Sequence, residues 1–109
     1  MSGQRHRAQR GDFVVTSELE VPSGGEAGLE AAFAHRLGAV DAWPGFVNLE
    51  VWRDGATEGR YLLVTWWRAR ADYMAYMRSE EHSTSHARVP SGALAPAAVA
   101  VRRFEVVAQ

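Results

Sequence analysis

Apolar and polar residues alternate from Phe13 to Val21, which predicts a strand with one buried face. The apolar positions of this strand are Phe13, Val15, Leu19 and Val21. Ser17 lies on the same face and interrupts it with a hydroxyl group. Pro22 and Gly24 follow closely and end the strand, because these residue types favour turns.

Two further segments have the spacing of helices. From Glu26 to Val40, apolar residues recur at steps of four, four and three, so they form one stripe along a helix. That stripe consists of Leu29, Phe33, Leu37 and Val40. We expect a second helix over Arg70–Arg78, continued over Ser79–Arg88 by a short or broken helical turn and then by a loop over Val89–Pro96. The apolar side of this second helix consists of Ala69, Tyr73, Tyr76 and Met77.

Three more apolar segments predict strands. Phe46–Arg53 and Arg60–Trp67 are joined by a turn that begins at Asp54, which is typical of a hairpin with a longer loop. Ala97–Val107 is the last strand. The segment Arg60–Trp67 is apolar on both faces, and a strand of this kind is covered on both sides. The two helices can cover one face of this strand. We therefore expect a partner subunit to cover the other face.

The order strand, helix, strand, strand, helix, strand predicts an α+β fold of the ferredoxin-like type, with an antiparallel sheet. A chain of 109 residues fits one domain, which we expect over residues 12–109. Residues 1–11 are polar and include four basic residues, Arg5, His6, Arg7 and Arg10, so they are expected to form a disordered tail. A chain this short gains from burying further surface in a homodimer.

Charge and composition narrow the functional classes. With 12 basic and 13 acidic residues, the formal net charge of −1 argues against a general nucleic-acid binder. The absence of cysteine excludes disulfides and thiolate chemistry and fits a cytoplasmic protein. The sequence contains no apolar run near the roughly 20 residues that span a bilayer, so no membrane partner is expected.

Candidate chemistry centres on His86, which follows the second helix. A neutral imidazole beside a large apolar pocket suits an axial ligand of heme iron. The expected pocket walls are Phe33, Tyr73, Tyr76 and Met77. Arg36 could pair with a propionate at the pocket mouth, and Ser17 could donate a hydrogen bond to a bound ligand or oxygen. Two alternatives remain open: that the aromatic residues form only the core, and that Ser17 bonds to backbone or water.

Other histidines offer weaker sites. His82 and His86 are four residues apart and share a helix face, so they could hold a metal, but a third nearby ligand of the zinc-enzyme kind is missing. His35 flanks the stripe of the first helix and is interpreted as a packing or surface residue. His6 lies in the expected tail.

Several segments together resemble a known family. These are Phe33–Arg36, Trp43–Phe46, Tyr61–Trp67 and Arg103–Val107, and the resemblance spans Asp12 to Val107. The chain looks like an antibiotic biosynthesis monooxygenase domain, with the nearest likeness to the small heme-degrading monooxygenases of the IsdG/MhuD type. The resemblance implies a ferredoxin-like domain whose homodimer closes two sheets into a barrel.

The resemblance also implies roles for individual residues. His86 falls on the histidine that binds the iron, and Arg36 falls on an arginine near the propionates. Ser17 replaces the family's asparagine that bonds the distal ligand, and Tyr76 replaces a tryptophan that presses on the macrocycle. The implied function is oxidative ring opening of heme with release of iron, with heme as substrate and oxygen-activating cofactor and electrons from an external reductase. The alternatives are a cofactor-free monooxygenase of an aromatic or polyketide-like substrate, and a non-catalytic dimeric domain that binds heme.

Overall fold

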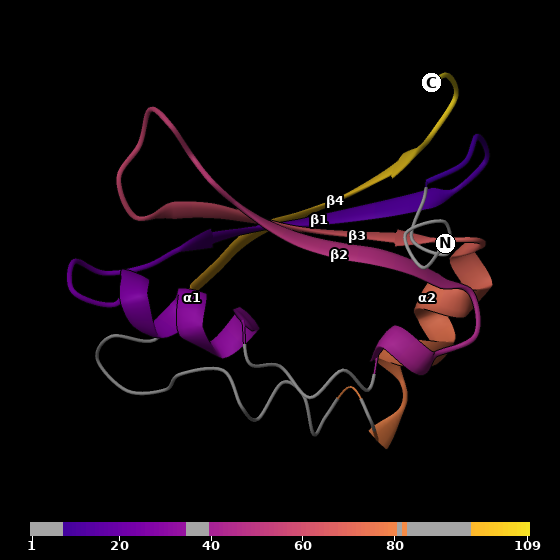
Figure 1. Cartoon of the computed structure of the whole chain (residues 1–109), viewed down its shortest axis with the longest axis horizontal. Coiled ribbons are helices and arrows are strands. Elements are labelled where there is room, and N and C mark those ends of the chain that lie inside the picture. Colours follow the sequence, from indigo (N-terminus) through magenta and orange to yellow (C-terminus); the bar gives the residue numbers. More distant parts are fainter. Residues whose placement is uncertain (1–7, 35–39, 81, 83–96) are drawn as a thin grey trace.

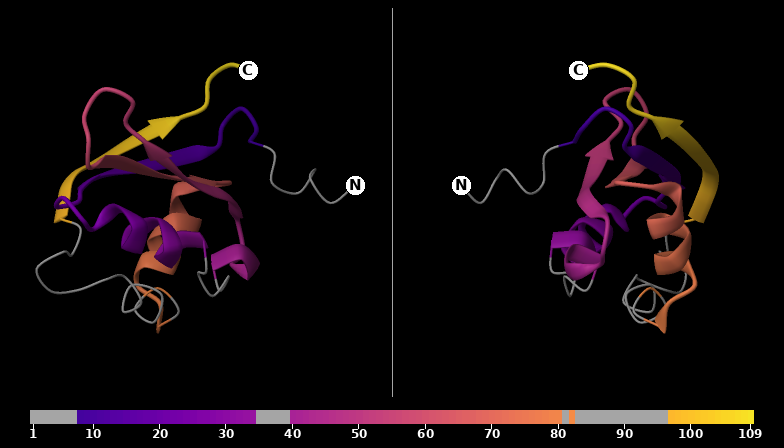
Figure 2. Two further views of the ribbon diagram at one scale, coloured as in Figure 1. Left: turned by 60° about the vertical axis from the view of Figure 1, so that its left-hand side comes forward. Right: turned by 90° about the vertical axis from the view of Figure 1, so that its right-hand side faces the viewer.

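A computed structural model describes residues 8–34, 40–80, 82 and 97–109 of the chain. In this part of the chain, strands β1 (Phe13–Glu20), β2 (Phe46–Arg53), β3 (Arg60–Trp67) and β4 (Ala97–Glu105) form one antiparallel sheet. Helices α1 (Glu26–Ala34) and α2 (Arg70–Met77) lie on the same face of the sheet, near opposite ends of it (Figures 1 and 2). A short 3-10 helix, η2 (Val40–Ala42), precedes β2.

The strand order is β2-β3-β1-β4, with β1 antiparallel to both of its neighbours. β3 therefore lies between β1 and β2, which α1 connects in sequence. This is the split β-α-β arrangement of a ferredoxin-like fold, so the predicted α+β class and element order are confirmed. The dimeric barrel is not tested by a single chain and stays a prediction.

Some predicted element ends were wrong. Val40 was placed in the first helix, but it begins η2, where the Trp43 amide donates to the Val40 carbonyl oxygen at 3.0 Å. This is the short spacing of a 3-10 turn, and Pro44 and Gly45 leave no room for a longer helix. The last strand ends at Glu105 rather than Val107, because its pairing with β1 ends where Glu105 meets Phe13.

The residues just before β1 pack against the end of β4. The Gly11 amide donates to the Val106 carbonyl oxygen at 2.7 Å, and the Gln9 amide donates to the Asp12 carboxylate at 2.7 Å. Asp12 is only 2% exposed and accepts two bonds from Nη1 of Arg68, at 2.9 and 2.8 Å. A buried charge needs such pairing, and here it joins the start of β1 to the residue after β3. The segment 8–11, which composition placed in the tail, thus forms defined bonds.

The apolar core divides into two clusters on the helix side of the sheet. The first cluster, at the α2 end, consists of Val15, Val40, Trp67, Tyr73 and Tyr76, with Phe13, Trp43, Phe46, Leu49 and Met74 packed against it. The second cluster, at the α1 end, consists of Val21, Leu29 and Tyr61, with Leu19, Phe33 and Val51 packed against it. These members confirm the helix-facing positions predicted from the alternation of β1.

The opposite face of the sheet carries large exposed apolar side chains. Trp52 is 47% exposed and contacts Trp66 edge to face at 6.3 Å, and Phe104 is 43% exposed beneath Arg102. On the same face, Arg60 pairs with Glu18 and with Glu20. Val99 and Val101 of β4 are also each 50% exposed, but Val101 is the direct partner of Ser17 and therefore lies on the helix-facing side. Exposed apolar surface of this extent is typical of an interaction site.

Among the described residues, no helix is long and apolar enough to cross a membrane.

Candidate functional site

A strip of sheet between the two core clusters faces the helices. Ser17 of β1 pairs with Leu63 of β3, and Leu63 pairs in turn with Val51 of β2. Because side chains alternate along a strand, Ser17 shares the face of Val15 and Leu19, each of which belongs to a different cluster. Ser17 and Leu63 are only half-buried, and neither belongs to a cluster of the described residues. The strip therefore offers a polar and an apolar contact on the floor between α1 and α2.

Tyr73 and Tyr76 form the aromatic wall at the α2 end. Tyr76 contacts Trp67 at 5.5 Å and the edge of Trp43 at 5.4 Å between ring centroids, and Tyr73 contacts Trp67 at 5.7 Å. Both tyrosines are buried, at 6% and 8% exposure. This packing fits the interpretation that they form the core, and their contact with a bound molecule stays a prediction.

Met77 does not pack with the two tyrosines. It is 40% exposed, whereas Met74 packs on the first cluster. The sequence pattern placed Met77 on the apolar side and missed Met74. A helix of eight residues is too short for the pattern to fix which methionine turns inward.

His82 is half-buried behind α2. Its ring lies edge to face on Tyr76, with 5.3 Å between centroids, and its amide donates to Oγ of Ser79 at 3.1 Å. Ser79 Oγ in turn donates to the Tyr76 carbonyl oxygen at 2.6 Å. Ser79 therefore links the last turn of α2 to the backbone of His82, and it holds His82 against the aromatic wall.

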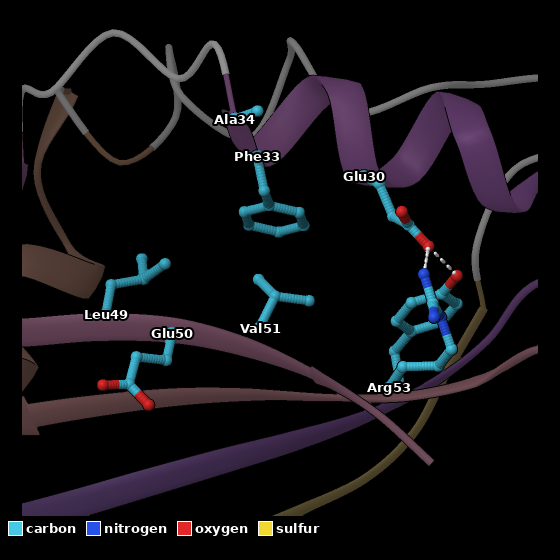
Figure 3. Close-up of a pocket in the computed structure, with 8 residues that line it drawn as sticks. Glu30, Phe33, Ala34, Leu49, Glu50, Val51 and Arg53 are labelled. Atoms are coloured by element: carbon cyan, nitrogen blue, oxygen red, sulfur yellow. Dashed lines mark hydrogen bonds and ion pairs between the residues drawn. The ribbon is translucent and has the colours of Figure 1, made fainter. Parts of the chain in front are cut away.

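A cavity of about 360 Å³ lies under α1, along β2 (Figure 3). The Phe33 ring projects from α1 toward Val51, with Leu49 beside it on β2. The lining residues are Glu30, Phe33, Ala34, Leu49, Glu50, Val51, Arg53 and Tyr61. Half of these side chains are apolar and half carry polar or charged groups, so the cavity offers both kinds of contact to a small molecule.

Charge is concentrated at one end of this cavity. The Tyr61 hydroxyl donates to Oε2 of Glu30 at 2.5 Å, and Nη2 of Arg53 donates to the same oxygen at 2.8 Å. These two bonds, the tyrosine's first, lower the pKa of the Glu30 carboxyl from its ordinary value of 4.5. The bond to Glu30 and burial raise the pKa of the Tyr61 hydroxyl above 10.0. At neutral pH the cluster thus holds a carboxylate, a neutral phenol and a guanidinium.

Sequence reasoning missed this charged cluster. Arg53 and Tyr61 are partners in the β2–β3 pairing, so the hairpin brings them together, but Glu30 is 23 and 31 residues away from them. One feature of the sequence pointed to part of this cluster, since Arg53 and Tyr61 fall on the helix side of a predicted hairpin.

Of the other predicted site residues, Phe33 lines this cavity, and its contact with a bound heme stays a prediction. His86, Arg36 and His35 lie outside the described residues, so their roles stay predictions. Among the residues that are described, no group of three or more histidine, cysteine, aspartate or glutamate side chains could hold a metal ion.

The sequence matches a family model. The model described as antibiotic biosynthesis monooxygenase matches residues 12–88. This segment includes β1, both helices, the β2–β3 hairpin and the residues that follow α2 up to the end of the match.

Two curated relatives share part of the sequence. The mycobilin-producing heme oxygenase of Mycobacterium tuberculosis is 38% identical over 63 residues, which are 58% of this chain and 60% of the relative. The match thus spans less than two thirds of that relative's length. The staphylobilin-producing heme oxygenase of Staphylococcus haemolyticus is 32% identical over 77 residues, 68% of this chain and 72% of the relative.

A solved structure extends the likeness to almost the whole fold. The heme degrader MhuD from Mycobacterium tuberculosis, solved with two hemes bound in its active site, superimposes with a TM-score of 0.73 at 33% identity. The superposition covers 89% of this chain and 97% of that one.

Proposed function

We propose that this chain, which belongs to the antibiotic biosynthesis monooxygenase family, binds heme as its substrate and degrades it by oxidative ring opening. The named activities of relatives that are 32% and 38% identical support the proposal. The heme-bound MhuD structure supports it across the length of the fold.

One structural observation carries the proposal. The core is split into two clusters, and the floor between them exposes Ser17 and Leu63 toward the helices. A flat apolar molecule can lie on Leu63, with Phe33 on the α1 side and the wall of Tyr73 and Tyr76 on the α2 side. The described residues thus fit a planar macrocycle of low polarity.

Each residue has a separate proposed role. His86 binds the iron, Arg36 pairs with a propionate, and Ser17 donates a hydrogen bond on the distal side. Tyr76 shapes the pocket, and Phe33, Tyr73 and Met77 contact the ring. Bound heme supplies the iron on which oxygen is activated, while the protein residues orient the ring and exclude water. Electrons come from an external donor such as a reductase.

A hemin titration tests binding and the iron ligand. We expect the wild-type protein to shift the Soret band of hemin, and we expect His86→Ala to lose this shift. His82→Ala is the matched control, because it removes an imidazole four residues earlier in the sequence and should keep the shift. A wild-type protein that leaves the hemin spectrum unchanged would contradict the proposal and favour the cofactor-free monooxygenase.

Turnover is tested on the complex. With ascorbate under air, the Soret band should decay and a chelator should capture released iron. A stable spectrum would contradict degradation and would leave the chain as a heme-binding domain.

We further propose that two copies pair through the open face of the sheet, with Trp52 and Phe104 in the interface. Their exposure and the exposed β4 support this pairing. Light scattering after size exclusion should give twice the mass of 12.0 kDa, and Trp52→Glu should give the monomer mass. A wild-type monomer would contradict the dimer.

A cytoplasmic location is proposed on the absence of cysteine alone.

A further inference from the structure

Helix α1 has a small apolar contact with the sheet. Leu29 is its one buried residue and is 0% exposed, in contact with the cluster of Val21 and Tyr61. Phe33 adds a partly buried contact one turn later. Because helix stability in proteins comes mainly from packing, a nine-residue helix with this little burial needs further attachment.

Glu30 provides that attachment. Its Oε2 accepts the bond from the buried Tyr61 hydroxyl at 2.5 Å and the bond from Arg53 at 2.8 Å. Among the described residues, these are the side-chain hydrogen bonds that join α1 to the sheet. Both donors stand on the β2–β3 hairpin as direct cross-strand partners. One carboxylate oxygen therefore fixes α1 to two strands at a single point.

This point is close to the proposed pocket. Phe33 is three residues after Glu30, so the two side chains are neighbours on one side of the helix. Figure 3 shows the Phe33 ring above Val51 and Glu30 reaching toward Arg53, with the cavity of about 360 Å³ between helix and strand. A helix held at Glu30 keeps the phenyl ring at a fixed height above β2.

We propose that Glu30 is a positioning residue. It fastens α1 to the hairpin and thereby sets the distance between β2 and the Phe33 ring, which forms a wall of the pocket. The inference rests on the proposed function, because the molecule that this wall contacts is heme. When Glu30 loses its partners, α1 leaves its docked position more often. Heme then binds only to the docked fraction, so its apparent affinity falls in proportion.

The test compares Glu30→Gln and Tyr61→Phe with the wild type. In the protein without heme, α1 should be undocked in most molecules of Glu30→Gln, so amide hydrogen exchange over residues 26–34 should lose most of its protection. The apparent Kd for hemin should rise about five- to tenfold in the same variant. The Soret maximum of the bound hemin should not move, because the iron ligand is unchanged. Tyr61→Phe, which keeps the Arg53 bond, should show smaller changes in both quantities.

Glu58→Gln is the matched control. It removes the same charge from an exposed position in the β2–β3 loop and should change neither quantity. Unchanged exchange over residues 26–34 in both test variants overturns the inference, and so does faster exchange with an unchanged Kd for hemin. A shifted Soret maximum also overturns it, because Glu30 would then act on the iron. If the wild type binds no hemin, the proposed function fails and the inference about its pocket fails with it. Unchanged Kd values beside a wild type that binds hemin overturn the inference alone.

Discussion

Ser17 of β1 lies directly opposite Leu63 of β3 in the antiparallel sheet, on the face that the helices cover. The pair separates the cluster around Trp67 from the cluster around Leu29. Ser17 is half-buried, so its hydroxyl group remains accessible to a molecule that lies on this face, and a hydroxyl can donate a hydrogen bond to it. This position therefore suits a side chain whose partner is the bound molecule.

Replacing Ser17 should separate binding from turnover. Ser17→Ala keeps the apolar floor, so we expect its affinity for hemin to stay close to that of the wild type. The rate of Soret decay with ascorbate should fall about fivefold, since a hydrogen bond contributes about 1 kcal/mol. Thr16→Val is the control, because its side chain lies on the other face of β1. Equal decay rates in Ser17→Ala and the wild type would refute a role for the hydroxyl.

Gly45 should be intolerant of a side chain for two reasons. Its φ of +83° lies in the left-handed region, and a Cβ built there would stand 2.1 Å from Oδ2 of Asp72. Gly24 has a similar φ of +93° with open space around it, so Gly24→Ala measures the backbone cost alone, about 1–2 kcal/mol. Gly45→Ala should cost about 1–3 kcal/mol more through the overlap with Asp72.

Urea denaturation of these variants measures the backbone cost and the cost of the overlap with Asp72 separately. The new Cβ would also meet the Cβ of Asp72, so only Asp72→Gly removes the whole overlap. Once the cost of a helical glycine, measured in Asp72→Gly alone, is subtracted, the double variant Gly45→Ala/Asp72→Gly should return to the cost of Gly24→Ala. A double variant that stays as unstable as Gly45→Ala after this subtraction would show that Asp72 is not the cause.

Much of the fold followed from local patterns. The alternation in β1 predicted which of its residues face the helices, because a strand has only two faces. The β3 segment is apolar on both faces, so its pattern predicted burial but not which side the helices cover. The end of the first helix was less predictable, since the apolar stripe of Leu29, Phe33 and Leu37 extended to Val40. In the structure, Val40 belongs to the 3-10 helix η2. Local spacing does not report which of two packings a short segment adopts.

The candidate site divides in the same way. Phe33 and Ser17 were chosen as candidates from helix and strand spacing, and their roles toward a bound molecule stay predictions. The bonds of Glu30 join residues far apart in the sequence, and their partners depend on how α1 crosses the hairpin. Only the tertiary structure contains that crossing.

Tyr76 tests how far the aromatic wall supports the fold. It is 6% exposed and contacts Trp43, Trp67 and His82. Tyr76→Ala should lower the free energy of unfolding by about 3–5 kcal/mol, as for other large aromatic side chains removed from a core. Tyr76→Phe should cost little, because the hydroxyl makes no hydrogen bond among the described residues. A large loss in Tyr76→Phe, measured by urea denaturation, would reveal a partner for the hydroxyl.

The Glu30 cluster should make stability depend on pH on the acid side. The pKa of Glu30 is lowered in the folded protein, chiefly by the bond from Tyr61 and then by Arg53, relative to its ordinary value of 4.5. The unfolded state therefore binds a proton first, so the contribution of Glu30 is complete above pH 4.5 and is lost as pH falls through the folded pKa. Urea midpoints of the wild type and Glu30→Gln should differ at neutral pH and converge in acid. Arg53 stays charged throughout, because this pH range lies far below the pKa of a guanidinium. A difference between the two proteins that is constant from neutral to acid pH would show that Glu30 stabilises α1 by packing rather than as a charged acceptor.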